Sequence, residues 1–450
     1  MHFFSSSRES RVRTRLHAVA AAAAGAAMLA ACGGGSDHRG AVPVLFPVPP
    51  AAQPASPPPA PAVTAQKACG ELNGKTVAGA ALTAAMQDAA AGAPVYCKVT
   101  GTIAPALNFQ ISLPEAWNGK LYYQGGGGYN GAITPPSVPA LGLGYAVVAS
   151  DSGHQGNVLS ADFALTDTFA AQLFGSLSVP TVMSTATETL AAAYGALPAK
   201  SYFEGCSNGG REALMAVQRA PNLFDGVIAR APAYNWVGFM GAFNRNSRAL
   251  AAPGGAFSAA KTALLSKHVR DACDGLDGLV DGVVSNQAAC TPALANVAAL
   301  RCAGGTDTGD TCLSDAQLDV VTSWTTQASF TGSPTFRNAG WNLTGNEDDP
   351  GAWRTWLTGD GSVTSALQFL FQDTTVKNYL ARDRTVDSLA YTPWDQNQNA
   401  LYAMAALNDA TLVADAIAQT LGVNVRSARS IGAALRDHIR AKHLLLILDN

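Results

Sequence analysis

Short apolar or alternating segments recur through the first half of the chain and predict strands. They are residues 96–101, 109–113, 121–124, 143–150, 200–204 and 224–229. Two longer runs between them predict helices, namely the alanine-rich run 181–194 and the run 211–219. Because strands that alternate with helices are typical of a sheet covered by helices, this half of the chain predicts an α/β fold.

The pattern changes after Trp236. From there to about Ile431 the sequence is helical and rich in loops, with no clear alternation of strands and helices. The run 442–448 is apolar again and predicts one more buried strand. The chain therefore predicts a sheet domain followed by a region of a different kind.

The first 32 residues have the pattern of a secretory signal. Four arginines precede the apolar, alanine-rich run 18–28, which is too short to span a membrane. Residues 29–32, Leu-Ala-Ala-Cys, resemble a bacterial lipoprotein box in which Cys32 is lipidated; a plain signal peptide cut nearby is the alternative. Residues 33–66 are rich in proline and predict a linker that cannot build a core.

Those segments predict an exported protein, either lipid-anchored to the bacterial outer membrane through Cys32 or periplasmic, whose membrane contact is through the lipid alone. The 450 residues include 29 basic and 32 acidic ones, so no nucleic-acid partner is expected. Export permits disulfides. Once Cys32 is set aside for lipid, the pairs closest in sequence leave Cys206 unpaired; they are Cys69–Cys97, Cys273–Cys290 and Cys302–Cys312.

Residues 205–209, Gly-Cys-Ser-Asn-Gly, contain the pattern Gly-x-Ser-x-Gly with Ser207 at its centre. A strand is predicted before it and a helix after it. In such a turn the serine hydroxyl is exposed at the carboxyl edge of the sheet, and the small flanking residues let the turn close. The chain has 44 glycines, so an ordinary glycine-rich turn is the alternative.

A second glycine-rich segment, residues 125–131, directly follows the predicted strand 121–124. In serine hydrolases a loop at this place donates a backbone N–H to the oxyanion that forms during acyl transfer. A merely flexible loop is the alternative interpretation.

Three carboxylates lie within eight residues at Asp274, Asp277 and Asp281, with glycines between them. Carboxylates this close repel one another unless a cation is present, and Ca²⁺ prefers six to eight oxygen ligands. The spacing is not that of an EF-hand. A solvated acidic turn is the alternative.

Residues 205–211, Gly-Cys-Ser-Asn-Gly-Gly-Arg, resemble the tannase and feruloyl esterase family of serine hydrolases, and the resemblance runs from about Cys69 to at least Gly359. It implies an α/β-hydrolase sheet with a large inserted helical and loop-rich lid. The domains are then a core at 67–235, a lid at 236–431 and the start of a returning strand at 432–450.

The resemblance also implies roles for single residues. It assigns the backbone N–H groups of Gly128 and Asn208 to the oxyanion, and it makes His154 a structural or site-lining residue and not the base. It implies a structural Ca²⁺ in the lid. The implied ligands are the side chains of Asp274, Asp277 and Asp281 and the carbonyls of Leu279 and Val283.

In that family the triad follows the order Ser, Asp, His. Asp449 is the only acid near the predicted strand 442–448, and the family's His-Gly turn before the acid is absent. No histidine follows it, while His438 and His443 lie before or within the strand. In the family the cysteine beside the nucleophile bonds to a cysteine beside the catalytic histidine, and no cysteine follows Cys312. We therefore expect an esterase truncated at its C-terminus.

The resemblance implies a carboxylic ester hydrolase that acts on small aromatic esters through a Ser207 acyl-enzyme. Residues 365–372 lack the arginine with which one family member binds its substrate's carboxylate, which favours feruloyl or galloyl esters. The alternative is a catalytically incomplete, calcium-stabilised surface lipoprotein that binds aromatic ligands without hydrolysing them.

Overall fold

A mixed sheet forms the centre of the molecule. The computed structural model describes residues 63–330, 333–391, 404 and 446–449. Within these residues a nine-stranded sheet has the strand order β1-β2-β3-β4-β6-β5-β7-β8-β11. The strands are β1 (Thr76–Val77), β2 (Ala80–Gln87), β3 (Tyr96–Ile103), β4 (Leu107–Pro114), β5 (Lys120–Gln124), β6 (Ala146–Ser150), β7 (Lys200–Cys206), β8 (Gly226–Arg230) and β11 (Leu446–Asp449).

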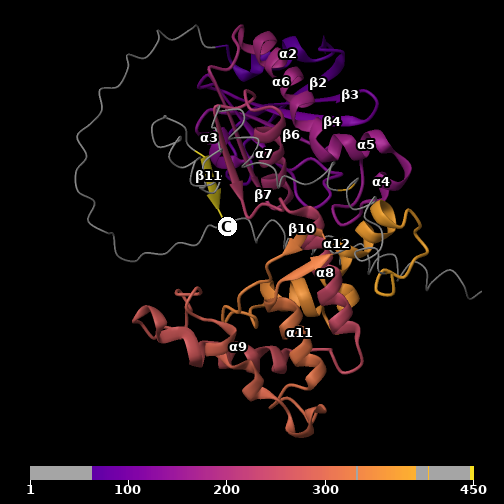
Figure 1. The fold of residues 1–450 in the computed structure, drawn as a ribbon. Helices are drawn as coiled ribbons and strands as arrows, with labels where there is room; N and C mark the ends of the chain where they lie inside the picture. The colour runs from indigo at the N-terminus through magenta and orange to yellow at the C-terminus, as the bar shows by residue number, and fades with distance from the viewer. Residues whose placement is uncertain (1–62, 331–332, 392–403, 405–445, 450) are drawn as a thin grey trace, which may run out of the picture.

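Strands β1 to β4 pair antiparallel, and β4 joins β6 in the same way. Strands β6, β5, β7, β8 and β11 are parallel to one another. Because the carboxyl ends of parallel strands meet at one edge of a sheet, the turns after β5, β7 and β8 lie at the same edge. That edge faces the lid in Figure 1.

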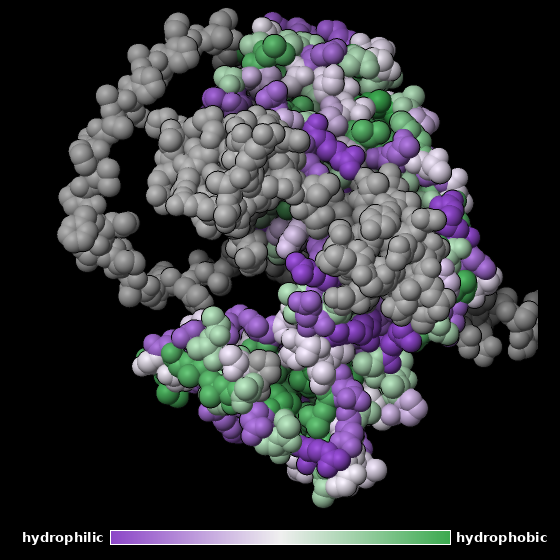
Figure 2. All heavy atoms as spheres, in the orientation of Figure 1, coloured by the Kyte–Doolittle hydropathy of each residue, from purple (hydrophilic) through white to green (hydrophobic). Residues whose placement is uncertain are grey.

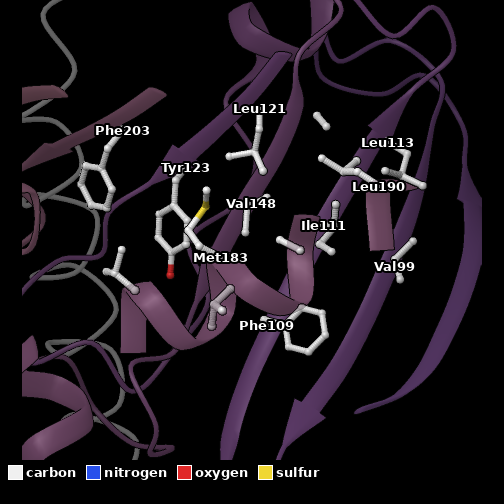
Figure 3. Packing of buried hydrophobic residues seen from close by; sticks show 14 of the residues in the cluster. Val99, Phe109, Ile111, Leu113, Leu121, Tyr123, Val148, Met183, Leu190 and Phe203 are labelled. Atoms are coloured by element: carbon white, nitrogen blue, oxygen red, sulfur yellow. The ribbon is translucent and has the colours of Figure 1, made fainter. Parts of the chain in front are cut away.

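Helices cover the sheet and close its core. They are α2 (Ala65–Leu72), α3 (Val138–Gly142), α4 (Asp162–Thr166), α5 (Thr168–Gln172), the π-helical η1 (Leu173–Leu177), α6 (Ser178–Tyr194) and α7 (Asn208–Arg219). Met183 and Leu190 of α6 pack beside Phe109, Ile111 and Leu121, all fully or almost fully buried (Figure 3). Burial of such side chains contributes about 1.5–3 kcal/mol each.

The predicted α/β architecture is confirmed, with small shifts of boundary. The segment predicted as a strand at 143–150 begins at Ala146, because Leu143 ends the short helix α3. Strand β2 was not predicted: its sequence, Ala-Ala-Leu-Thr-Ala-Ala-Met-Gln, carries helix-forming residues and is held in the sheet by pairing with β3.

The lid begins at Trp236 and lies below the sheet in Figure 1. Its helices are α8 (Trp236–Ala251), α9 (Ala259–Cys273), α10 (Pro292–Ala295), α11 (Asp315–Thr325) and α12 (Leu367–Thr375), with the shorter turns η2 (Asp274–Asp277), η3 (Val297–Leu300), η4 (Ala303–Gly305), η5 (Pro350–Thr358), η6 (Val363–Ser365) and η7 (Val376–Leu380). A two-stranded sheet, β9 (Ala328–Phe330) with β10 (Ser333–Asn338), was not predicted. Most of the predicted lid beyond residue 391 lies outside the described residues.

The three predicted local disulfides are formed. Cys69–Cys97 joins α2 to β3, Cys273–Cys290 closes the acidic loop, and Cys302–Cys312 closes a third loop. Cys206 also takes part in a disulfide, so the prediction that it is unpaired is wrong. Pairing by sequence proximity could not assign Cys206, because every cysteine after Cys32 other than Cys206 has a partner close to it in sequence.

Disulfides of this kind are consistent with an exported protein. In the described part of the chain, we find no helix with the length and apolarity needed to cross a membrane. Figure 2 shows hydrophilic and hydrophobic residues interspersed over the visible described surface of both domains. Cys32, the linker and residues 405–445 lie outside the description.

Candidate active site

Ser207 occupies the turn between β7 and α7, with φ 58° and ψ −119°. A positive φ is unfavourable for a residue with a side chain, so neighbouring contacts must hold the turn. The Ser207 N–H donates to the carbonyl oxygen of Arg230 in β8 (3.0 Å), and the Ser207 carbonyl accepts from the N–H of Ala233 (3.1 Å). The predicted strand–turn–helix arrangement is therefore present at the carboxyl edge of the sheet.

Backbone contacts explain the glycines on either side of Ser207. A Cβ on Gly205 would lie 2.3 Å from the backbone of Gly209, and a Cβ on Gly209 would lie 2.8 Å from the carbonyl oxygen of Gly126. No side chain fits at these distances. The absence of side chains brings the glycine-rich loop directly against the first turn of α7.

Glu212 connects that loop to α7 and is only 5% exposed. Its carboxylate accepts hydrogen bonds from the N–H of Gly126 (2.9 Å), the amide of Asn130 (2.8 Å), the hydroxyl of Ser152 (3.0 Å) and the amide of Asn208 (3.3 Å). The Asn208 amide also donates to Oδ1 of Asn130 (2.7 Å). Since a buried carboxylate needs several donors, this network fixes the loop relative to Ser207.

Arg211 joins the same turn to the lid. It is fully buried and donates to the carbonyl oxygens of Phe174 (2.8 Å) and Gly175 (2.7 Å) and to Oδ1 of Asn208 (2.7 Å). Its guanidinium lies 4.5 Å from the ring centre of Phe174 and 5.3 Å from that of Trp236. Because Trp236 opens α8, one side chain holds the core, the turn and the lid together.

Gly128, Ser207 and Asn208 line one cavity of about 1260 Å³. Gly128 has φ 55°, and a Cβ there would lie 2.2 Å from the carbonyl oxygen of Val158, so only glycine fits. Asn208 is the first residue of α7, so its N–H has no partner within the helix. The cavity therefore brings together the serine and both predicted oxyanion donors.

The cavity is walled mainly by lid residues. Its aromatic lining consists of Tyr234, Trp236, Phe239, Phe243, Trp324, Trp341, Trp356 and Phe371. Amide side chains, among them Gln287, Asn338 and Gln368, add polar positions. A flat aromatic molecule with a few polar groups matches this lining.

The backbone of the predicted acid is described, whereas no base is found beside Ser207 among the described residues. Strand β11 ends at Asp449, which pairs in register with Arg230 of β8, so the backbone places Asp449 at the same sheet edge as Ser207. Among the described residues nothing hydrogen-bonds to the Ser207 hydroxyl. His438 and His443 lie outside the described residues.

His154 lies in a second cavity of about 480 Å³ and does not line that of Ser207. Its ring stacks on Phe163 with 3.7 Å between the ring centres and is 8% exposed. Burial lowers the pKa of this imidazole to about 4, so it is neutral at pH 7. His154 thus packs against aromatic side chains and lies outside the cavity of Ser207.

The acidic loop is described in full. Asp274 accepts from the N–H of Asp281 (3.3 Å) and of the next residue (2.9 Å), while Asp277 and Asp281 each accept from the N–H two residues on. In the described chain no three acidic, His or Cys side chains are gathered as a metal site. The three predicted aspartate ligands thus share a short loop with the predicted carbonyls of Leu279 and Val283, but their carboxylates are not gathered as a metal site. Carboxylate and carbonyl oxygens are the ligands that Ca²⁺ prefers.

The sheet order, the sharp turn at Ser207 and the lid define an α/β-hydrolase fold. The profile of the family described as "Tannase and feruloyl esterase" matches residues 90–417, and the chain belongs to this family.

Two curated relatives and one solved structure illustrate the similarity. The chain is 33% identical over 319 residues to the mono(2-hydroxyethyl) terephthalate hydrolase of Piscinibacter sakaiensis, covering 60% of this chain and 52% of the relative. It is 30% identical over 233 residues to a probable feruloyl esterase B-1 of Aspergillus flavus, covering 50% and 43%. The crystal structure of feruloyl esterase B from Aspergillus oryzae superposes with a TM-score of 0.66 at 21% identity, over 84% of this chain and 79% of that one.

That superposition shows a shared fold. The chain spans about half the length of the curated relatives it matches.

The residues that hold the turn at Ser207 in place and line its cavity were not predicted from the sequence. Arg211 and Glu212 follow the serine motif directly, and a charged pair just before the apolar run 213–217 was the available signal. Asn130 lies in the glycine-rich loop, but nothing in the sequence relates it to a carboxylate 82 residues away. The aromatic lining comes from scattered lid positions that only the fold brings together.

Proposed function

We propose that the protein hydrolyses small aromatic carboxylic esters through an acyl-enzyme on Ser207. The observation that supports this most is the shared cavity of Ser207, Gly128 and Asn208, with aromatic walls. The names of the relatives, feruloyl esterase and mono(2-hydroxyethyl) terephthalate hydrolase, agree with an ester of this kind.

In the proposed reaction Ser207 Oγ forms a bond to the ester carbonyl carbon and loses its proton to a base. The N–H groups of Gly128 and Asn208 stabilise the oxyanion, and the alcohol leaves with a proton as the C–O bond breaks. Water then attacks the acyl-enzyme and releases the acid. We propose that the base is a histidine contributed from outside the described residues and that Asp449 orients it.

The test is hydrolysis of methyl ferulate and 4-nitrophenyl acetate by the purified chain. Ser207→Ala should lower turnover by roughly a thousandfold or more, because it removes the nucleophile. Ser184→Ala, on the exposed face of α6, is the matched control and should leave the rate unchanged. Turnover that survives Ser207→Ala would refute the proposal.

A second function is binding without turnover, as a catalytically incomplete, calcium-stabilised surface lipoprotein. The observation in its favour is that the Ser207 hydroxyl has no hydrogen-bond partner among the described residues. Under this alternative, aromatic esters bind in the cavity and remain intact. Measured hydrolysis that depends on Ser207 would eliminate it.

For the acidic loop we propose a structural Ca²⁺ held by Asp274, Asp277 and Asp281 with the carbonyls of Leu279 and Val283. The ion would neutralise three carboxylates in a loop closed by the Cys273–Cys290 disulfide. We expect EGTA to lower the Tm by about 5 °C, since binding to the folded state alone stabilises it.

The control for the calcium experiment removes two of the three negative charges from the loop. The double variant Asp277→Asn with Asp281→Asn should no longer respond to EGTA, whereas Asp319→Asn, exposed on α11, should respond like the wild type. An identical Tm with and without EGTA in the wild type would show that the loop is a solvated acidic turn.

We further propose that Cys32 carries a lipid that anchors the protein to the outer membrane, which would require the disulfide partner of Cys206 to lie outside these 450 residues. The support is the lipoprotein-like sequence before Cys32 and the proline-rich linker after it. Cys32→Ser should then release the protein from the membrane fraction. Equal membrane association of the two forms would contradict lipidation.

A further inference from the structure

The cavity that contains Ser207 has a single charged side chain among its described lining residues. That residue is Arg337; the remaining lining residues are apolar, aromatic, amide, hydroxyl or glycine residues. No described carboxylate lines the cavity to neutralise it. An arginine that shares an aromatic-walled cavity with no described carboxylate is a binding position for an anion.

The backbone of Arg337 is fixed relative to Ser207. Arg337 lies in β10, and its carbonyl oxygen accepts from the side-chain amide of Asn235 (2.7 Å), the residue that caps α8. A Cβ on Gly238 would lie only 2.4 Å from the same oxygen, so β10 presses directly against the start of α8. Two residues before Asn235, the N–H of Ala233 bonds to the Ser207 carbonyl.

This short chain of contacts connects the turn at Ser207 to the lid strand that bears Arg337. One segment, residues 231–238, therefore contacts both the turn at Ser207 and the strand that bears Arg337. Aromatic side chains line the same cavity as these two residues.

We infer that Arg337 selects aromatic esters that carry a free carboxylate. The planar guanidinium offers paired N–H donors that match the two oxygens of a carboxylate. The arginine comes from β10, so it is available even though residues 365–372 lack one. The inference rests on the proposed function in one respect, namely that the bound ester is hydrolysed; binding of the carboxylate by Arg337 does not require hydrolysis.

The experiment compares two ligands of the same shape, methyl 4-carboxybenzoate and its neutral amide, methyl 4-carbamoylbenzoate. Binding is followed by quenching of tryptophan emission in the Ser207→Ala form of the full chain, because four tryptophans line the cavity and the ester stays intact. We expect the anion to bind about tenfold more tightly than the amide, and added NaCl to reduce that preference.

Arg337→Gln should abolish the preference for the anion while leaving the affinity for the amide unchanged. Arg337→Lys should keep part of it, because the charge remains and the paired geometry is lost. Lys267→Gln removes an exposed lid charge away from the cavity and should behave like the parent.

A parent protein that binds both ligands equally, or a preference that persists in Arg337→Gln, would overturn the inference. Neither result bears on whether Ser207 hydrolyses esters, which the Ser207→Ala comparison of rates decides. Conversely, a charge preference that depends on Arg337 in a chain without ester turnover would support the inference and refute the proposed hydrolysis.

Discussion

Gly205→Ala is expected to destabilise the protein by several kcal/mol and to abolish any Ser207-dependent activity. The added Cβ would lie 2.3 Å from the backbone carbon and oxygen of Gly209, and neither strand β7 nor helix α7 can move away without displacing the turn. Overpacking of this kind typically costs about 1–3 kcal/mol, and contact with backbone places the expected loss at or above the top of that range. Urea denaturation and ester hydrolysis measure the two effects.

The matched control is Gly127→Ala in the neighbouring glycine-rich loop. A Cβ there meets no atom within 4 Å, and this glycine does not have a positive φ. Its stability should therefore change by less than about 0.5 kcal/mol. If the two alanine variants were equally stable, the tight turn described at Ser207 would be wrong.

The second large effect is expected for Glu212→Ala. It leaves the buried donors of Gly126, Asn130 and Ser152 without their acceptor, and each such donor costs about 1–3 kcal/mol. We expect a loss of at least roughly 3 kcal/mol in the free energy of unfolding. Activity should fall further than stability predicts, since Gly128 would no longer be held opposite Ser207.

Two variants distinguish the loss of these hydrogen bonds from the loss of a negative charge. Glu188→Ala removes an exposed carboxylate on α6 and should be close to neutral. Glu212→Gln keeps the shape and one acceptor oxygen, so its loss should be intermediate. A Glu212→Ala variant as stable as Glu188→Ala would show that the carboxylate does not organise the loop.

The parts of the site that the sequence predicted are those whose signals are local. The turn at Ser207 is specified within about ten residues, by small residues around a serine with an apolar strand before it and an amphipathic helix after it. The three local disulfides join positions 10 to 28 residues apart, so proximity in sequence was sufficient. Strands β3 to β8 were recognised because their sequences are apolar or alternate between apolar and polar residues.

What the sequence did not predict depends on contacts between distant segments. Glu212 serves Gly126 and Ser152, which lie 86 and 60 residues away. Arg337 becomes a cavity residue only because β10 folds against α8, and the β9–β10 pair was itself not predicted. Strand β2 has helix-forming residues, so its conformation comes from pairing with β3 and not from its own preference.

The aromatic lining of the cavity comes entirely from residues after β8, whereas Ser207 and Gly128 belong to segments that precede its end. Under the proposed function, reaction and recognition are thus carried by separate stretches of the polypeptide. Descendants of this protein could then acquire a preference for a different ester by substitutions at a few aromatic positions, without disturbing the turn at Ser207. The same division gives an engineer a defined set of positions to randomise.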